Sequence, residues 1–210
     1  MQLIKDDFAI FRPGYADQVA KGFRPRIDND PVHLVLPLDW DMDPFHDRNW
    51  KFQLHAWRML DPIWSELYGQ DWNRLRNEIL PWVRDWYAYH VVRGLEAAFT
   101  WYDMSAGYRA QHLALLTDLH RRGTMPLEAS DFDLVRRVAE EHLSPLRTPA
   151  YIAMNNHGLF QLKGLRLLGA AWNGEPFCEG ELDYTTQMRD RLLDSQFDER
   201  GVHVENSPDY

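Results

Sequence analysis

From Trp50 onward, large apolar residues recur at three- and four-residue spacing, which is the period of a helix that buries one face. Short polar loops separate the periodic segments, so consecutive helices are expected to pack as antiparallel hairpins. Pro62 and Pro81 lie inside two of these segments and predict a bend or a break there. We therefore predict an all-α fold of about six to eight helices. The periodic segments are residues 50–67, 71–102, 105–123, 130–143, 156–172 and 178–197.

Residues 1–40 differ from the rest of the chain, because they are rich in proline and lack a helical period. Residues 33–36, His-Leu-Val-Leu, are the best candidate for a strand in this segment. We therefore expect an extended N-terminal segment over residues 1–40, followed by one helical domain over residues 41–210.

Charge and cysteine content exclude several classes of function. The formal net charge of −9 argues against general nucleic-acid binding, which needs a basic surface. Cys178 is the single cysteine, so neither an intrachain disulfide nor a cysteine metal cage can form. The chain has no HExxH motif and no glycine-rich phosphate loop. No metal and no cofactor is therefore expected.

The N-terminus has neither a basic region nor an apolar core of the kind found in signal peptides. No apolar run reaches the length that crosses a bilayer. The sequence taken literally predicts a soluble, cytoplasmic chain without a membrane partner. Removal of an export signal would make it periplasmic instead.

Residues 155–161, Asn-Asn-His-Gly-Leu-Phe-Gln, stand at the mouth of a leucine-rich helix. The Asn156 amide can cap this helix, and groups at a helix start also face any anion bound there. The alternative is that Asn155 is only a cap and that His157 is a half-buried histidine with its hydrogen bonds satisfied. The motif predicts either a local cap or part of a binding site.

Several further motifs occur in a fixed order around this one. Residues 47–55 read Asp-Arg-Asn-Trp-Lys-Phe-Gln-Leu-His, and residues 101–109 read Trp-Tyr-Asp-Met-Ser-Ala-Gly-Tyr-Arg. The chain ends with Gly-Val-His-Val-Glu-Asn-Ser-Pro-Asp-Tyr at residues 201–210. Together these motifs, which cover about residues 40–210, resemble the heparinase II/III-like polysaccharide lyases.

The resemblance implies an incomplete (α/α) toroid of helical hairpins, a fold that a β-sandwich domain normally follows. The chain stops at Tyr210, which makes it look like a toroid domain truncated at its C-terminus. The missing sandwich would supply a further catalytic group and one wall of the cleft. We therefore expect this chain to be weakly active or inactive by itself.

The implied reaction is β-elimination of an acidic glycan that contains uronate. The proton leaves C5, next to the carboxylate, and the glycosidic oxygen leaves C4, so donors must neutralise the carboxylate as charge develops. Asn156 is the first choice for such a donor, and His157 donates beside it or acts as the base. Tyr210 is the expected general acid, with a frayed chain end as the alternative.

Arg109 is the best candidate for binding a substrate carboxylate or sulfate, with an ion pair to a nearby carboxylate as the alternative. Asn49 could line the cleft or cap a helix, as could the neighbouring Asp47. Trp101 and Tyr102 could stack on a sugar ring or fill the core. The substrate-binding set predicted in addition to Arg109 is Asn155, Asn49, Trp50, His55, Trp101, Tyr102 and Glu205.

Two other functions fit the same pattern. A glycan-binding or scaffold module without catalysis would use the same amides and aromatic side chains. A glycoside hydrolase on a helical toroid would need a pair of carboxylates, for which Asp47 and Glu205 are the candidates. The products distinguish the three, because only elimination leaves an unsaturated uronate that absorbs ultraviolet light.

Overall fold

The computed structural model describes residues 3–196 of the 210-residue chain, and the predicted all-α class is confirmed. Within this range one isolated antiparallel bridge joins Phe23 and Val32, so the strand predicted at residues 33–36 is wrong. The helices are α1 (Tyr15–Lys21), α2 (Arg48–His55), α3 (Asp61–Leu67), α4 (Trp72–Tyr87), α5 (Asp103–Arg121), α6 (Ala129–Leu146), α7 (Asn156–Ala171) and α8 (Glu181–Gln196). Shorter helical turns cover Lys5–Asp7, Arg58–Leu60, Ala88–Val92, Pro149–Tyr151 and Pro176–Cys178.

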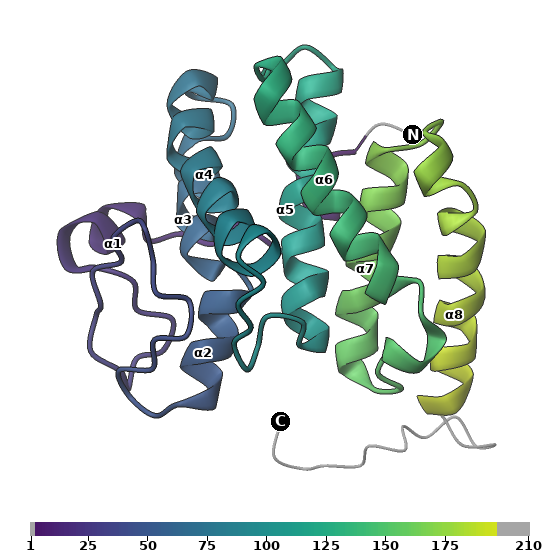
Figure 1. The fold of residues 1–210 in the computed structure, drawn as a ribbon, viewed down its shortest axis with the longest axis horizontal. Coiled ribbons are helices and arrows are strands. Elements are labelled where there is room, and N and C mark those ends of the chain that lie inside the picture. The colour runs from purple at the N-terminus through teal and green to yellow at the C-terminus, as the bar shows by residue number, and fades with distance from the viewer. Residues whose placement is uncertain (1–2, 197–210) are drawn as a thin grey trace.

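The helices follow one another as hairpins, in the order α3–α4, α5–α6 and α7–α8 (Figure 1). Across the hairpins, α5 packs most extensively against α7, and α6 contacts both α4 and α7. The first helices of the last two hairpins are therefore neighbours, as in stacked helical repeats. Closure into part of a toroid remains a prediction.

A single large hydrophobic core runs through the hairpins and includes the N-terminal segment. Leu3, Phe8 and Ile10 are buried in it, so residues 3–40 pack against the helices although most of them are irregular. Helix α1 lies in this segment and was not predicted. Six tryptophans are completely or almost completely buried in the core: Trp40, Trp50, Trp57, Trp64, Trp86 and Trp172.

Two prolines behave differently from one another. Pro62 lies in the first turn of α3, where its missing N–H costs nothing, and the chain is divided before it at Trp57, as the sequence predicts. Pro81 instead lies inside α4, which continues through it, so of the bend or break predicted there the break is wrong and the bend stays a prediction. Packing of the buried face of α4 outweighs the hydrogen bond that Pro81 removes.

Candidate functional site

The first turn of α7 is tied closely to the loop before it. The Asn155 side chain caps the helix by accepting a hydrogen bond from the His157 N–H at 2.9 Å. Gly158 approaches the loop so closely that a Cβ would lie 1.9 Å from the Ala153 carbonyl oxygen. The buried Gln161 amide accepts a hydrogen bond from the Ala153 N–H at 2.8 Å and donates one to the Tyr151 carbonyl at 2.9 Å. These contacts fix the direction in which His157 leaves the helix.

Helices α5 and α7 touch through two glycines, Gly107 in the second turn of α5 and Gly164 in the middle of α7. A Cβ added to Gly164 would lie 2.3 Å from the Gly107 carbonyl oxygen, so the two backbones are in contact. This contact places the starts of the two helices side by side. Asp103, the first residue of α5, therefore meets His157, with 3.1 Å between its Oδ2 and the imidazole Nδ1.

His157 lines a cavity of about 280 Å³, which we call the His157 cavity. The Tyr102 ring stands between two neighbours in it, with ring centroids 6.1 Å from His157 and 4.9 Å from Phe99. Three separate parts of the sequence meet here, from residues 47–55, 101–109 and 155–161. The complete lining is Arg48, Asn49, Phe52, Phe99, Tyr102, Met104 and His157.

The charges around this cavity are partly exposed and only partly paired. Arg48 is exposed and has no ion pair or side-chain hydrogen bond within residues 3–196. Burial raises the pKa of the Tyr102 phenol, Asp103 raises it further, and Arg48 acts in the opposite direction. The side chains of His157 and Asp103 are 29% and 20% exposed. The cavity thus offers a cation, an imidazole and a protonated phenol to a ligand.

A second hollow of about 450 Å³ adjoins the first and is lined by residues 96–98 and 100–102. Tyr102 lines both hollows. Trp101, for which the sequence allows either stacking on a sugar or filling of the core, lines this second hollow and is half-buried. Its backbone carbonyl also accepts a hydrogen bond from the Tyr151 hydroxyl at 2.6 Å.

Arg109 does not reach a substrate surface, and its predicted role is wrong. Its side chain is completely buried between the rings of Trp86 and Trp101. The guanidinium donates to the His142 Nε2 at 2.8 Å and to two backbone carbonyls at 2.5 Å. The alternative of a carboxylate partner is not found within residues 3–196 either, because the three acceptors of Arg109 are an imidazole and two carbonyls. Arg109 is a core cation.

Trp50 and His55 are also buried and cannot line the cleft that was predicted for them. Only one face of α2 borders the His157 cavity, and it carries Arg48, Asn49 and Phe52 at helical spacing. Trp50 points into the core from another face. His55 is the last residue of α2, and its buried ring has its centroid 6.0 Å from that of Trp40.

Asn49 and Tyr102 line the His157 cavity, as the sequence predicts for cleft residues. Asn155 is the helix cap and does not line it. Asn156 is half-buried as the first residue of α7, next to His157 but outside the lining. Tyr210 and Glu205 fall outside residues 3–196, so the structure describes neither.

The Asp47 carboxylate caps α2 by accepting the Asn49 N–H at 2.8 Å. This is the alternative that the sequence left open for Asp47. The carboxylate that a hydrolase would need at this end of α2 is therefore engaged by the backbone.

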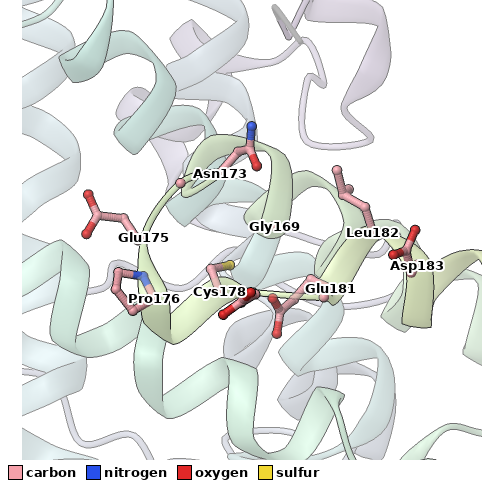
Figure 2. A pocket seen from close by; sticks show the side chains of 11 residues that line it. Gly169, Asn173, Glu175, Pro176, Cys178, Glu181, Leu182 and Asp183 are labelled. Carbon is pink, nitrogen blue, oxygen red and sulfur yellow. The ribbon is translucent and has the colours of Figure 1, made fainter.

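Another cavity, of about 510 Å³, lies between the end of α7 and the start of α8 (Figure 2). The carboxylates of Glu175, Glu181 and Asp183 are spread around it and do not converge on one point. No group of three histidine, cysteine, aspartate or glutamate side chains within residues 3–196 is placed to hold a metal ion. Burial raises the pKa of the Cys178 thiol here to about 12, so the thiol is unreactive.

Sequence reasoning missed Arg48 and Asp103 as site residues. Both belong to the motifs at residues 47–55 and 101–109, so the signal was present. Arg48 and the buried Trp50 are two residues apart in α2, and only the direction in which each side chain leaves the helix distinguishes them. Asp103 becomes relevant only when α5 and α7 are seen to start side by side.

No model of a known protein family, no curated protein and no solved structure matches this chain. Within the described residues, no helix is both long enough and apolar enough to cross a membrane.

Proposed function

We propose that the chain binds an acidic, uronate-containing glycan in the His157 cavity and cleaves it by β-elimination. One observation carries this proposal. Three motifs that resemble those of heparinase II/III-like lyases, far apart in the sequence, contribute their side chains to a single cavity. That cavity holds an imidazole, paired with Asp103, and the cation of Arg48.

Arg48 is suited to hold the uronate carboxylate. A guanidinium forms two parallel hydrogen bonds with a carboxylate, and Arg48 has no competing ion pair within the described part of the chain. The rings of Phe52, Phe99 and Tyr102 offer apolar faces for the sugar. This arrangement selects an anionic ring over a neutral one.

Asp103 determines which imidazole nitrogen of neutral His157 carries the proton. A carboxylate accepts hydrogen bonds, so the Nδ1 that lies 3.1 Å from Asp103 is the protonated nitrogen. The Nε2 lone pair is left without a partner within residues 3–196. Neutral His157 is therefore equipped to accept a proton, which favours the base over the hydrogen-bond donor among the two roles considered for it.

In the reaction, His157 Nε2 takes the C5 proton and the C5–H electron pair forms the C4=C5 double bond. The C4–O bond breaks, and the leaving oxygen takes a proton. Arg48 offsets the negative charge that develops on the carboxylate. The protonated His157 then returns its proton to solvent.

The leaving oxygen needs an acid, and Tyr102 is the phenol that lines the cavity. Burial raises its pKa, so it stays protonated at neutral pH. Tyr210, predicted for the same role, lies outside residues 3–196. Separate Tyr102→Phe and Tyr210→Phe variants assign the acid, because the variant that lacks it loses turnover on sugars with a poor leaving group.

The test is the ultraviolet absorbance of unsaturated uronate, measured over a panel of uronate-containing glycans. We expect one of them to give absorbance, at the low rate expected for this chain by itself, and His157→Ala to lower that rate by at least about 100-fold. Arg48→Gln should weaken binding about tenfold or more. The matched controls are His33→Gln and Arg191→Gln, two exposed positions outside the cavity, which should change neither quantity.

Other outcomes would replace the proposal. Reducing ends without the absorbance would indicate hydrolysis. Glycan binding that Arg48→Gln weakens, without either product, would indicate a binding module. Absence of both binding and products over the panel would contradict a glycan function for this cavity.

A further inference from the structure

Three basic side chains gather in a cavity on a different face of α7 from His157. This cavity, of about 380 Å³, lies between α7 and α8, which run side by side in Figure 1, and we call it the α7–α8 cavity. Lys163 and Arg166 come from α7, and Arg189 comes from α8. Such a cluster stands out in a chain whose formal net charge is −9.

Lys163 is the cation without a partner. It is half-buried, and no ion pair or hydrogen bond engages its ammonium group within residues 3–196. Burial lowers its pKa and the charge of Arg166 lowers it further, while Asp7 acts in the opposite direction. Two like charges are thus held close together in a partly desolvated place, where a bound anion would relieve their repulsion.

The acidic groups that line this cavity leave Lys163 unpaired within residues 3–196 and form a single long ion pair, between Asp7 and Arg166. Asp7 accepts the Ile4 N–H at 2.9 Å through Oδ2, and its Oδ1 is 3.9 Å from the Arg166 guanidinium, too far for a hydrogen bond. Asp6 also lines the cavity but makes no ion pair within the described residues. Arg189 is paired with its neighbour Asp190 on the exposed side of α8.

We propose that the α7–α8 cavity binds a tetrahedral oxyanion, sulfate or phosphate, either free or as an ester on a sugar. Lys163 and Arg166 would contact the oxyanion with charge-assisted hydrogen bonds, and Arg189 would close the third side. Leu159, which is 41% exposed, and the buried Leu162 give this cavity an apolar part against which the ring of an ester could pack. The site shares no residue with the His157 cavity and does not depend on the proposed lyase activity.

The test is an NMR titration of the full chain with sodium sulfate and, separately, sodium phosphate, against sodium chloride at equal ionic strength. We expect saturable shifts of the backbone amides around Lys163 and Arg189 with the oxyanions only. Lys163→Gln should weaken the affinity about tenfold, the loss expected for one charge-assisted hydrogen bond. Lys21→Gln, which removes an exposed lysine of α1, is the matched control and should bind unchanged.

Asp7→Asn gives a test with the opposite sign. If Asp7 serves only as the structural ion-pair partner of Arg166, its replacement should leave the affinity for oxyanions unchanged. A competing carboxylate predicts instead that oxyanions bind more tightly, by up to about fivefold. The NMR amide spectrum of the variant reports whether the fold is kept.

A sulfated monosaccharide and its unsulfated parent distinguish the two sources of the oxyanion. Tighter binding of the sulfated sugar than of inorganic sulfate would identify an ester, and equal affinity would identify the free anion. The proposal is overturned if neither sulfate, phosphate nor the sulfated sugar gives saturable shifts, or if Lys163→Gln binds as well as the original chain.

Discussion

Arg109 is a cation whose three hydrogen bonds all go to neutral acceptors. Burial lowers its pKa to about 9, and His142, two carbonyls and the faces of two tryptophans surround it. Because Arg109 donates to His142 Nε2, this imidazole must be neutral, and its Nδ1–H donates to the Val138 carbonyl at 2.7 Å. The pair is a structural junction between α5 and α6.

Replacing Arg109 should therefore cost stability in two different ways. Lysine keeps the charge but cannot reach three acceptors from one ammonium group, and Met removes the charge but leaves the acceptors unpaired. We expect each variant to lose about 3 kcal/mol of unfolding free energy in urea titrations, with Arg191→Lys on the surface of α8 unchanged within about 0.5 kcal/mol. A Met variant more stable than the original chain would show that the desolvated charge outweighs its hydrogen bonds.

Asp103 is expected to act on the reaction through His157 as a positioning residue. Asp103→Ala removes the acceptor of the Nδ1–H, so nitrogen-15 NMR should show a smaller population of this tautomer and the elimination rate should fall about tenfold or more. Asp103→Asn keeps an acceptor oxygen and should preserve the tautomer. An unchanged tautomer in the Ala variant would exclude this role, whether or not the chain proves to be a lyase.

At the scale of elements, the contact between α5 and α7 brings the His157 cavity together. Gly→Ala within a helix usually stabilises by up to about 1 kcal/mol. At Gly164 we expect the reverse, because the new Cβ would meet the Gly107 carbonyl at 2.3 Å and force the helices apart. Gly164→Ala should lose about 2–4 kcal/mol in urea unfolding and widen the distance from Asp103 to His157. If the variant has the same free energy of unfolding as the original chain, α7 can shift away from α5 without cost.

The helices themselves were largely predictable, since their buried faces repeat at helical spacing. The start of α7 was found because Asn155 and Asn156 mark a cap, although the capping residue is Asn155. The periodic segment 105–123 begins at Ser105, in contrast, whereas α5 begins at Asp103 and buries Ser105 within its first turn. Local side-chain chemistry allows either residue to begin the helix, and packing against α7 decides between them.

The candidate site was predictable only in part. Periodicity could not tell that Arg109 and His55 face the core while Arg48 faces outward, because α5 is buried on nearly every side and α2 is short. His157 and Tyr102 were identified from their motifs. Their meeting with Arg48 depends on the contact between helices from different hairpins, which no short stretch of sequence encodes.

At the scale of the whole molecule, buried histidines dominate the response of stability to acid. Burial lowers the pKa of His55, His112 and His142 well below 6.5, and that of His90 to about 4. These side chains are neutral in the folded chain and take up protons on unfolding once the pH is below about 6.5. Asp61 works in the opposite direction, because burial raises its pKa to about 8.

We therefore expect stability to be highest near neutral pH and to fall steeply as the pH drops from about 6.5 to 5. Each buried neutral histidine contributes up to about 1.4 kcal/mol per pH unit, since its unfolded form binds the extra proton. The Asp61 contribution is present at low pH and is lost as the pH rises through about 8, so it offsets one histidine at most.

His142→Gln keeps an acceptor for Arg109 but cannot bind a proton. In urea unfolding at several pH values, the free energy of unfolding of this variant should change less steeply with pH, by about the contribution of one histidine. Equal slopes for the variant and the original chain would mean that His142 is already protonated in the folded state, which its hydrogen bond from Arg109 forbids.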